Sequence, residues 1–249
     1  MNIFTQENFK TAPSLILFDL DNTLYEYNTP HKLALKEVSS KISSMFSITE
    51  ENFKEVFNEA RKDVKNRLLS TGSSHSRLLY FQRCMEIMDL GSQPLAALDL
   101  EQTYWITFLR NAQLFDGVRE FLDEIRLMGI PSAIITDLTS QIQFKKIINF
   151  RLDQYFDYVV TSEEAGCDKP AKAIYDLALN KTSYQSGSIW MIGDDPEKDI
   201  KGSKDAINAI TLEKISSLNS QTKDIKPDLD FHNFEDIKRL LLKINNYEK

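Results

Sequence analysis

A short apolar stretch followed at once by two carboxylates constrains this chain more than any other feature of its sequence. Residues 14–19 are rich in Leu, Ile and Phe and predict a buried strand. Asp19 and Asp21 come at its end, separated by one leucine. Two acids there are costly unless they bind a cation or share protons, and open α/β sheets bind ligands at this end of their strands. We therefore expect a functional site, with an ordinary acidic turn as the alternative.

Strand patterns and helix patterns alternate through most of the chain. Further strands are predicted at 131–136, 158–161, 188–193 and 206–211. Helical patterns are found at 118–129, 141–149 and 171–180, as a helical turn at 198–205, and from about residue 235 onward after a polar connector at 219–227. This alternation predicts an α/β fold with a doubly wound, mostly parallel sheet and right-handed crossovers.

The block 27–114 contains only helical patterns. Apolar residues recur at helical spacing over about 29–46, 50–64, 78–88 and 95–110. Thr49 precedes two glutamates and is expected to cap the second of these helices. We therefore predict an α/β domain made of residues 1–26 and 115–249, with an all-helical domain, 27–114, inserted after its first strand.

Composition argues against several kinds of partner. The formal net charge of −7 at pH 7 argues against a nucleic acid held by phosphate contacts. Apolar stretches fall short of the roughly 20 residues that span a bilayer, and the first residues lack a secretory pattern. Cys84 and Cys167 lie far apart and without metal-binding spacing, which suits a reducing compartment. We expect a cytoplasmic protein with no membrane and no nucleic-acid partner; the oligomeric state stays open.

Polar residues follow two more of the predicted strands, and a parallel sheet would bring them to the edge where Asp19 lies. Thr136 and Asp137 come at the end of 131–136. A hydroxyl there can bind an anionic oxygen, although Thr-Asp is also a good helix cap. Lys169 follows 158–161 and precedes Pro170, which holds it extended. Such a lysine suits a fixed cation aimed at a phosphate, with an ordinary surface lysine as the alternative.

An acidic segment, 193–199, follows the strand at 188–193. Gly193 lets the backbone approach closely, and Asp194 is placed to complete a cation site with Asp19 and Asp21. Asp199 lies one turn further and could orient a metal-bound water or a neighbouring lysine. The alternative is a solvated acidic helix start, which the helix dipole favours.

Together these residues supply oxygen ligands and one cation, without His or Cys. Mg²⁺ prefers such ligands: few carboxylates, several waters and a substrate phosphate. A divalent ion would offset the repulsion among the acids and keep Asp19 ionised as a nucleophile. Phosphoryl transfer needs an in-line nucleophile with positive charge around the transferred oxygens. The pattern therefore predicts Mg²⁺-dependent phosphoryl transfer.

The order and placement of these motifs resemble those of the haloacid-dehalogenase-superfamily (HAD) hydrolases of the phosphatase type with a helical C1 cap. The segment 19–23 resembles the first motif of that family, Thr136 the second, Lys169-Pro170 the third and the segment 193–199 the fourth. The resemblance covers nearly the whole chain. It implies a Rossmann-like HAD core, formed by 1–26 and 115–249, and a helical cap, formed by 27–114.

The resemblance also implies catalytic and substrate-binding roles. Asp19 would be the nucleophile that forms an aspartyl-phosphate intermediate. Asp21 would protonate the leaving alcohol and then activate the hydrolytic water. Thr136 and Lys169 would hold the phosphoryl group, and Asp137 would meet the substrate beside them.

A metal site is implied as well. The side chains of Asp19 and Asp194 and the backbone carbonyl of Asp21 would ligate Mg²⁺. Asp195 and Asp199 would support these ligands from the same segment.

Two departures from the family pattern affect the loops. Asp137 stands where many relatives carry Asn, and Ala171 stands where many carry His. The presence of Asp21 is more informative, because the dehalogenases of the superfamily lack an acid at this position. It favours a phosphatase acting on a small phosphorylated metabolite, either a sugar phosphate or a nucleotide. A phosphomutase using the same two acids, or a non-catalytic binding module, are the alternatives.

The cap is expected to select the leaving group. Its candidate contacts are polar or aromatic residues: Tyr25, Tyr27, His75, Arg77, Tyr80 and Arg83. His75 and Arg77 follow the polar break at 70–74 and could face the cleft, with a solvated helix start as the alternative.

Overall fold

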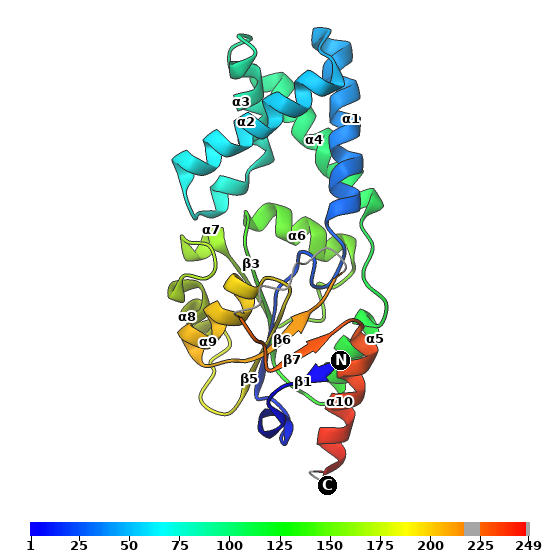
Figure 1. Cartoon of the computed structure of the whole chain (residues 1–249), viewed down its shortest axis with the longest axis vertical. Helices are drawn as coiled ribbons and strands as arrows, with labels where there is room; N and C mark the ends of the chain where they lie inside the picture. Colours follow the sequence, from blue (N-terminus) through cyan, green and yellow to red (C-terminus); the bar gives the residue numbers. More distant parts are fainter. Residues whose placement is uncertain (217–224, 248–249) are drawn as a thin grey trace. The chain divides into compact units, whose positions relative to one another are not determined.

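The computed structural model describes residues 1–216 and 225–247 (Figure 1). The chain divides into two compact units. The core unit comprises Met1–Glu26 and Gln113–Lys249, and the helical unit comprises Tyr27–Ala112. The boundary predicted after residue 114 lies two residues beyond the end of the helical unit.

A mixed sheet forms the centre of the core unit. Its strands in the described ranges are β1 (Asn2–Ile3), β2 (Leu15–Phe18), β3 (Ser132–Thr136), β4 (Tyr158–Thr161), β5 (Ile189–Gly193), β6 (Ile210–Lys214) and β7 (Leu229–Phe231). They are ordered β1-β7-β6-β5-β2-β3-β4, and every neighbouring pair is parallel except β1 with β7. The chain adds strands first on one side of β2 and then on the other, so the topology switches between β2 and β5. This confirms the predicted α/β fold.

Helices pack on both faces of the sheet. They are α5 (Val118–Leu127), α6 (Ser140–Asn149), α7 (Ser162–Ala165), α8 (Lys172–Lys181), α9 (Gly202–Ile207) and α10 (Phe234–Tyr247), with short helices η1 (Gln6–Phe9) and η3 (Pro196–Lys201), the latter a π-helix. Leu15 and Leu17 of β2 belong to the apolar cluster that includes Ile174 and Ala178 of α8. Phe18 contacts Phe121 of α5 with ring centroids 6.2 Å apart. Side chains that alternate along β2 thus bury themselves in two different layers.

Two parts of the sheet differ from the sequence prediction. The strand predicted at 206–211 is wrong in its position, because Ala206 and Ile207 end α9 and β6 begins at Ile210. Asn208, at φ 53°, adopts the left-handed conformation that ends a helix, so the apolar run spans a helix end and a strand start. Strands β1 and β7 were not predicted, because two and three residues are too few for a periodic pattern. Most of the predicted connector, 219–224, lies outside the described residues.

The helical unit consists of α1 (Asn28–Phe46), α2 (Glu50–Leu68), η2 (Gly72–His75), α3 (Arg77–Ile87) and α4 (Pro94–Asn111). Helix α1 packs on α4, and α2 packs on α3. The Thr49 hydroxyl accepts a hydrogen bond from the Asn52 amide at 3.3 Å, so Thr49 caps the N-terminus of α2 as predicted. The apolar stripe of α2 is buried as its spacing predicts, at Phe53, Val56, Phe57, Ala60 and Val64. Across the described ranges, every helix is too short or too polar to cross a bilayer.

A buried glutamate in β6 makes stability depend on pH. Glu213 pairs in register with Asp230 of β7 and is 5% exposed. Burial, together with the charge of Asp230, raises the pKa of Glu213 from 4.5 to about 7. Between these values the folded protein keeps a proton that the unfolded chain has lost, so this residue makes stability fall as the pH rises through that window.

Replacing Glu213 by glutamine is expected to remove this pH-dependent loss. At pH 8 the free energy of unfolding of the variant should exceed that of the wild type by about 1 to 3 kcal/mol, and the difference should shrink toward pH 4.5. Urea unfolding at pH 5, 6.5 and 8 measures it. Glu120→Gln, at an exposed position of α5, is the matched control. A difference between wild type and Glu213→Gln that does not vary with pH would contradict the interpretation.

Candidate active site

Three charged side chains meet at the switch point of the sheet. Asp19 follows β2, and its amide donates to the carbonyl of Ile192 in β5 at 2.9 Å. Lys169 Nζ lies 2.7 Å from Asp19 Oδ1 and 2.6 Å from Asp199 Oδ1. All three side chains are buried. The three residues follow β2, β4 and β5, and the parallel sheet therefore brings them together as the sequence predicts.

Burial and mutual charge control the protonation of this group. Burial raises the pKa of Asp19 to about 7, although the Lys169 ammonium opposes this shift and Asp199 adds to it. The pKa of Asp199 is also raised by burial, again against Lys169. Burial alone would lower the pKa of Lys169, but the two carboxylates hold it well above its usual value. Two buried acids therefore share one buried cation, and a further positive charge would stabilise their ionised forms.

The oxygen atoms around Asp19 fit a divalent cation. Carboxylate oxygens of Asp19, Asp194 and Asp199 all lie within 4.8 Å of one another. The Thr23 hydroxyl donates to Asp19 Oδ2 at 2.9 Å and lies 3.5 Å from Asp194 Oδ1. An all-oxygen set that includes two or three carboxylates, some of them buried, is the donor chemistry that Mg²⁺ prefers. The residues present therefore fit the predicted ion.

Asp199 is already engaged by its own loop. Its Oδ2 accepts hydrogen bonds from the amides of Asp194 at 3.1 Å and Asp195 at 3.0 Å, while its Oδ1 contacts Lys169. A Cβ at Gly193 would lie 2.3 Å from the Asp199 carboxyl carbon, so this loop requires glycine at position 193. Asp199 thus fixes the backbone that carries Asp194.

Asp195 stabilises another part of the same loop. Its Oδ1 accepts from the amides of Glu197 and Lys198, each at 3.0 Å, and so caps the start of η3. These contacts shape the loop, and the supporting role of Asp195 stays a prediction.

Thr136 and Asp137 lie at the end of β3, beside Lys169. The Thr136 hydroxyl accepts from Gln143 Nε2 of α6 at 2.7 Å. Asp137 Oδ1 accepts from the Lys169 amide at 2.9 Å, and Asp137 Oδ2 lies 2.8 Å from Lys198 Nζ. Asp137 therefore joins the loops after β3, β4 and β5. The peptide bond between Lys169 and Pro170 is cis.

Asp21 points to a different set of partners from Asp19. Both of its carboxylate oxygens lie 2.7 Å from Lys146 Nζ, and the Tyr25 hydroxyl donates to Oδ1 at 2.6 Å. Sequence reasoning missed Lys146 and Gln143, which are buried polar residues on α6. The available signal was their spacing, because they share the helix face of Ile142 and Ile147.

The residues predicted to read the leaving group are distributed over both units. Tyr25 belongs to the core unit, where it contacts Asp21. In the helical unit the Arg77 guanidinium lies 5.3 Å from the ring centroids of Tyr80 and Tyr104 and hydrogen bonds to the Tyr27 hydroxyl. His75 ends η2, and its carbonyl accepts from Arg77 Nη1 at 2.6 Å. Arg83 pairs with Asp63 at 2.6 Å and with Glu86 at 3.3 Å.

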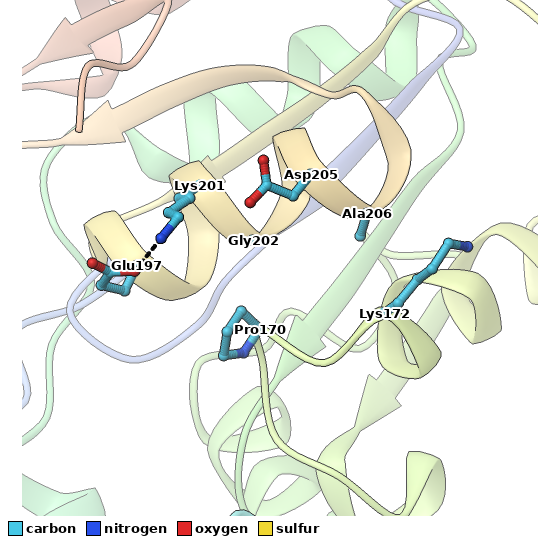
Figure 2. Close-up of a pocket in the computed structure, with 7 residues that line it drawn as sticks. All are labelled: Pro170, Lys172, Glu197, Lys201, Gly202, Asp205 and Ala206. Carbon is cyan, nitrogen blue, oxygen red and sulfur yellow. Dashed lines mark hydrogen bonds and ion pairs between the residues drawn. The ribbon is translucent and has the colours of Figure 1, made fainter. Parts of the chain in front are cut away.

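A surface pocket of about 250 Å³ lies next to the third and fourth motifs (Figure 2). Its lining comprises Pro170, Lys172, Glu197, Lys201, Gly202, Asp205 and Ala206. Figure 2 shows Lys201 directed toward Glu197, with which it forms an ion pair at 3.4 Å. Asp19, Asp194 and Lys169 do not line this pocket, so it is not the candidate active site.

Comparisons with known proteins agree with this geometry. Residues 16–212 match the haloacid dehalogenase-like hydrolase family. The chain is 36% identical over 218 residues to the ribulose-1,5-bisphosphate 5-phosphatase of Halopiger xanaduensis, covering 86% of this chain and 89% of that protein. It is 28% identical to the glyceraldehyde 3-phosphate phosphatase of Methanocaldococcus jannaschii, covering 86% and 88%. A magnesium-bound HAD-hydrolase of Bacillus subtilis has a similar fold, with a TM-score of 0.69 at 21% identity over 93% of this chain and 99% of that one. The chain therefore belongs to the haloacid dehalogenase-like hydrolase family, and it is a phosphoric monoester hydrolase.

Proposed function

We propose that this hydrolase is a Mg²⁺-dependent phosphatase that removes phosphate from a small sugar phosphate through an aspartyl-phosphate intermediate. One observation carries the proposal. A buried carboxylate, Asp19, lies at the switch point of the sheet, 2.7 Å from the Lys169 ammonium and within 4.8 Å of oxygens from Asp194 and Asp199. A nucleophile with positive charge beside it and oxygen ligands around it is what phosphoryl transfer requires.

The chain's own residues account for both halves of the reaction. Asp19 attacks phosphorus, and the bond from phosphorus to the leaving oxygen breaks. Asp21 gives its proton to that oxygen, so the alcohol departs neutral. Water then attacks the phosphorus of the acyl phosphate and loses a proton to Asp21, and the bond from phosphorus to Asp19 breaks. Phosphate leaves, Asp19 is again a carboxylate, and Asp21 again holds a proton.

Positive charge and hydrogen-bond donors would surround the negatively charged phosphoryl group during its transfer. Lys169 neutralises charge on the phosphoryl oxygens, and the Thr136 hydroxyl and neighbouring amides bind them. Asp19, Asp194 and the backbone carbonyl of Asp21 would hold Mg²⁺, with Asp199 and Asp195 shaping the loop. Once bound, the ion would act as a Lewis acid toward a phosphoryl oxygen. Asp137 is proposed to position Lys169 and to line the phosphate side of the site.

The two relatives described above support a sugar phosphate over a nucleotide as the substrate, because their names specify ribulose-1,5-bisphosphate and glyceraldehyde 3-phosphate. A phosphomutase is the alternative, because it would use the same Asp19 and Asp21. A cytoplasmic location, expected from the composition, stays a prediction.

The test is phosphate release by the purified chain. With Mg²⁺ we expect release from a panel of sugar phosphates, with slower release from nucleoside monophosphates. Removal of the metal with EDTA should lower the rate by at least about 100-fold, and added Mg²⁺ should restore it. An active enzyme that is unaffected by EDTA would contradict the metal dependence. Conversion of a sugar phosphate into its isomer without free phosphate would identify a mutase, and the absence of either reaction would overturn the proposal.

A further inference from the structure

Lys146 and Tyr25 form a fixed binding site for the Asp21 carboxylate. The Lys146 ammonium, on α6, is fully buried and lies 2.7 Å from each oxygen of Asp21. Tyr25 is also fully buried, and its ring lies 4.8 Å from that of Phe150, centroid to centroid. The same ring lies 5.8 Å from Lys146 Nζ. The two donors are therefore held by packing within the core unit, and they hold Asp21 in turn.

A lysine at this position is costly for the fold. Lys146 shares the buried face of α6 with Ile142 and Ile147, where an unbranched apolar side chain would fill the space without losing hydration. It forms an ion pair with Asp21, whose side chain is 30% exposed. The buried charge therefore acts on a carboxylate that a substrate can reach.

The hydrogen bonds distinguish the two oxygens of Asp21. Oδ1 receives two donors, the Tyr25 hydroxyl at 2.6 Å and Lys146 Nζ at 2.7 Å. Within the described residues, Oδ2 receives one donor, Lys146 Nζ at 2.7 Å. A carboxyl oxygen that carries a proton must leave room for it, whereas a carbonyl oxygen can accept two hydrogen bonds. Oδ1 is therefore the more firmly held oxygen, and Oδ2, with one donor fewer, has room for a further hydrogen bond.

We propose that Lys146 and Tyr25 are positioning residues that orient Asp21 so that Oδ2 delivers the proton to the leaving oxygen of the substrate. This inference rests on the proposed phosphatase function. Both residues act through Asp21 without touching the substrate. Their effect is therefore confined to substrates whose leaving group needs a proton.

The leaving group provides the test. An alkoxide is a poor leaving group and requires the acid, whereas 4-nitrophenolate departs with little protonation. The quantity kcat/KM reports only steps up to formation of the phosphoenzyme, in which Asp21 acts solely as an acid. For Lys146→Met we expect kcat/KM to fall about 10- to 100-fold with glycerol 3-phosphate and less than about 3-fold with 4-nitrophenyl phosphate. Lys146→Arg should recover part of the loss, because it keeps the charge.

Controls separate positioning from folding. Lys145→Met, at the neighbouring exposed lysine of α6, should change neither substrate. Tyr25→Phe removes a single hydroxyl and should show the same selectivity, with kcat/KM falling about 3- to 10-fold with glycerol 3-phosphate only. If Lys146→Met fails to fold, Tyr25→Phe alone tests the inference. An equal loss on both substrates, or no loss on either, would overturn the inference. Failure of the wild type to release phosphate from either substrate would instead overturn the proposed function.

Discussion

Asp19→Asn is expected to lower phosphate release by at least about 1,000-fold, because an amide oxygen is a poor nucleophile toward phosphorus. Asparagine has nearly the same shape, and its oxygen can still accept from Lys169 Nζ, which lies 2.7 Å from Asp19 Oδ1. The Thr23 hydroxyl can accept from the new amide group in place of donating to Oδ2. The variant should therefore fold, and the loss should lie in the chemical step.

Two measurements make this prediction specific. Acid quenching during turnover of a ³²P-labelled substrate should trap labelled protein for the wild type and none for Asp19→Asn. The matched control is Asp153→Asn, at an exposed turn of the core unit, which should keep full activity. An Asp19→Asn protein that is folded by circular dichroism and retains most of its activity would contradict the assignment of the nucleophile.

Lys169→Met is expected to reduce both activity and stability. The substitution removes the cation shared by Asp19 and Asp199 and leaves two buried carboxylates facing each other. Breaking a buried ion pair on one side costs about 3 to 5 kcal/mol. Phosphate release should fall at least about 1,000-fold, because the phosphoryl oxygens also lose their positive partner.

The stability effect should depend on pH and on Mg²⁺. Without Lys169, the opposing charge that limits the already raised pKa of Asp19 is absent, so the folded protein should hold a proton to higher pH than the unfolded chain. The loss in unfolding free energy should therefore be larger at pH 8 than at pH 5, and Mg²⁺ should recover part of it at pH 8. Lys172→Met, at an exposed lysine of α8, is the control and should cost less than about 0.5 kcal/mol. A loss independent of both pH and Mg²⁺ would mean that the charge of Lys169 is not what stabilises the site.

Residues that follow strands could be predicted from the sequence, because a parallel sheet brings all its strand ends to one edge. Asp19, Lys169, Asp194 and Asp199 lie together for this reason, although they are up to 180 positions apart in the chain. The strand pattern alone is therefore enough to predict which residues meet at the centre of the site.

The partners of Asp21 and Asp137 could not be predicted in the same way. Lys146 looks like any polar residue of an amphipathic helix until the rotation of α6 against the sheet is known. The pair between Asp137 and Lys198 joins two loops, and no local pattern couples them. Such contacts depend on tertiary packing, which propensity and periodicity do not specify. The short edge strands β1 and β7 form for the same reason, through pairing with each other and with β6.

The antiparallel packing of α1 and α4 has a consequence for the order of folding. The Tyr27 ring lies 5.2 Å from that of Phe108, and Lys41 contacts Asp99 at 2.6 Å, so the inserted helices leave and return at nearly the same place. Pairing of the central strands requires a long loop to close, since Ile16 of β2 pairs with Ser132 of β3. Once the helical unit has formed from its own local contacts, that closure spans a much shorter effective loop, which lowers its entropic cost by about 1 kcal/mol. The insertion therefore acts as a tether that brings β2, the strand directly before Asp19, to its partner during folding.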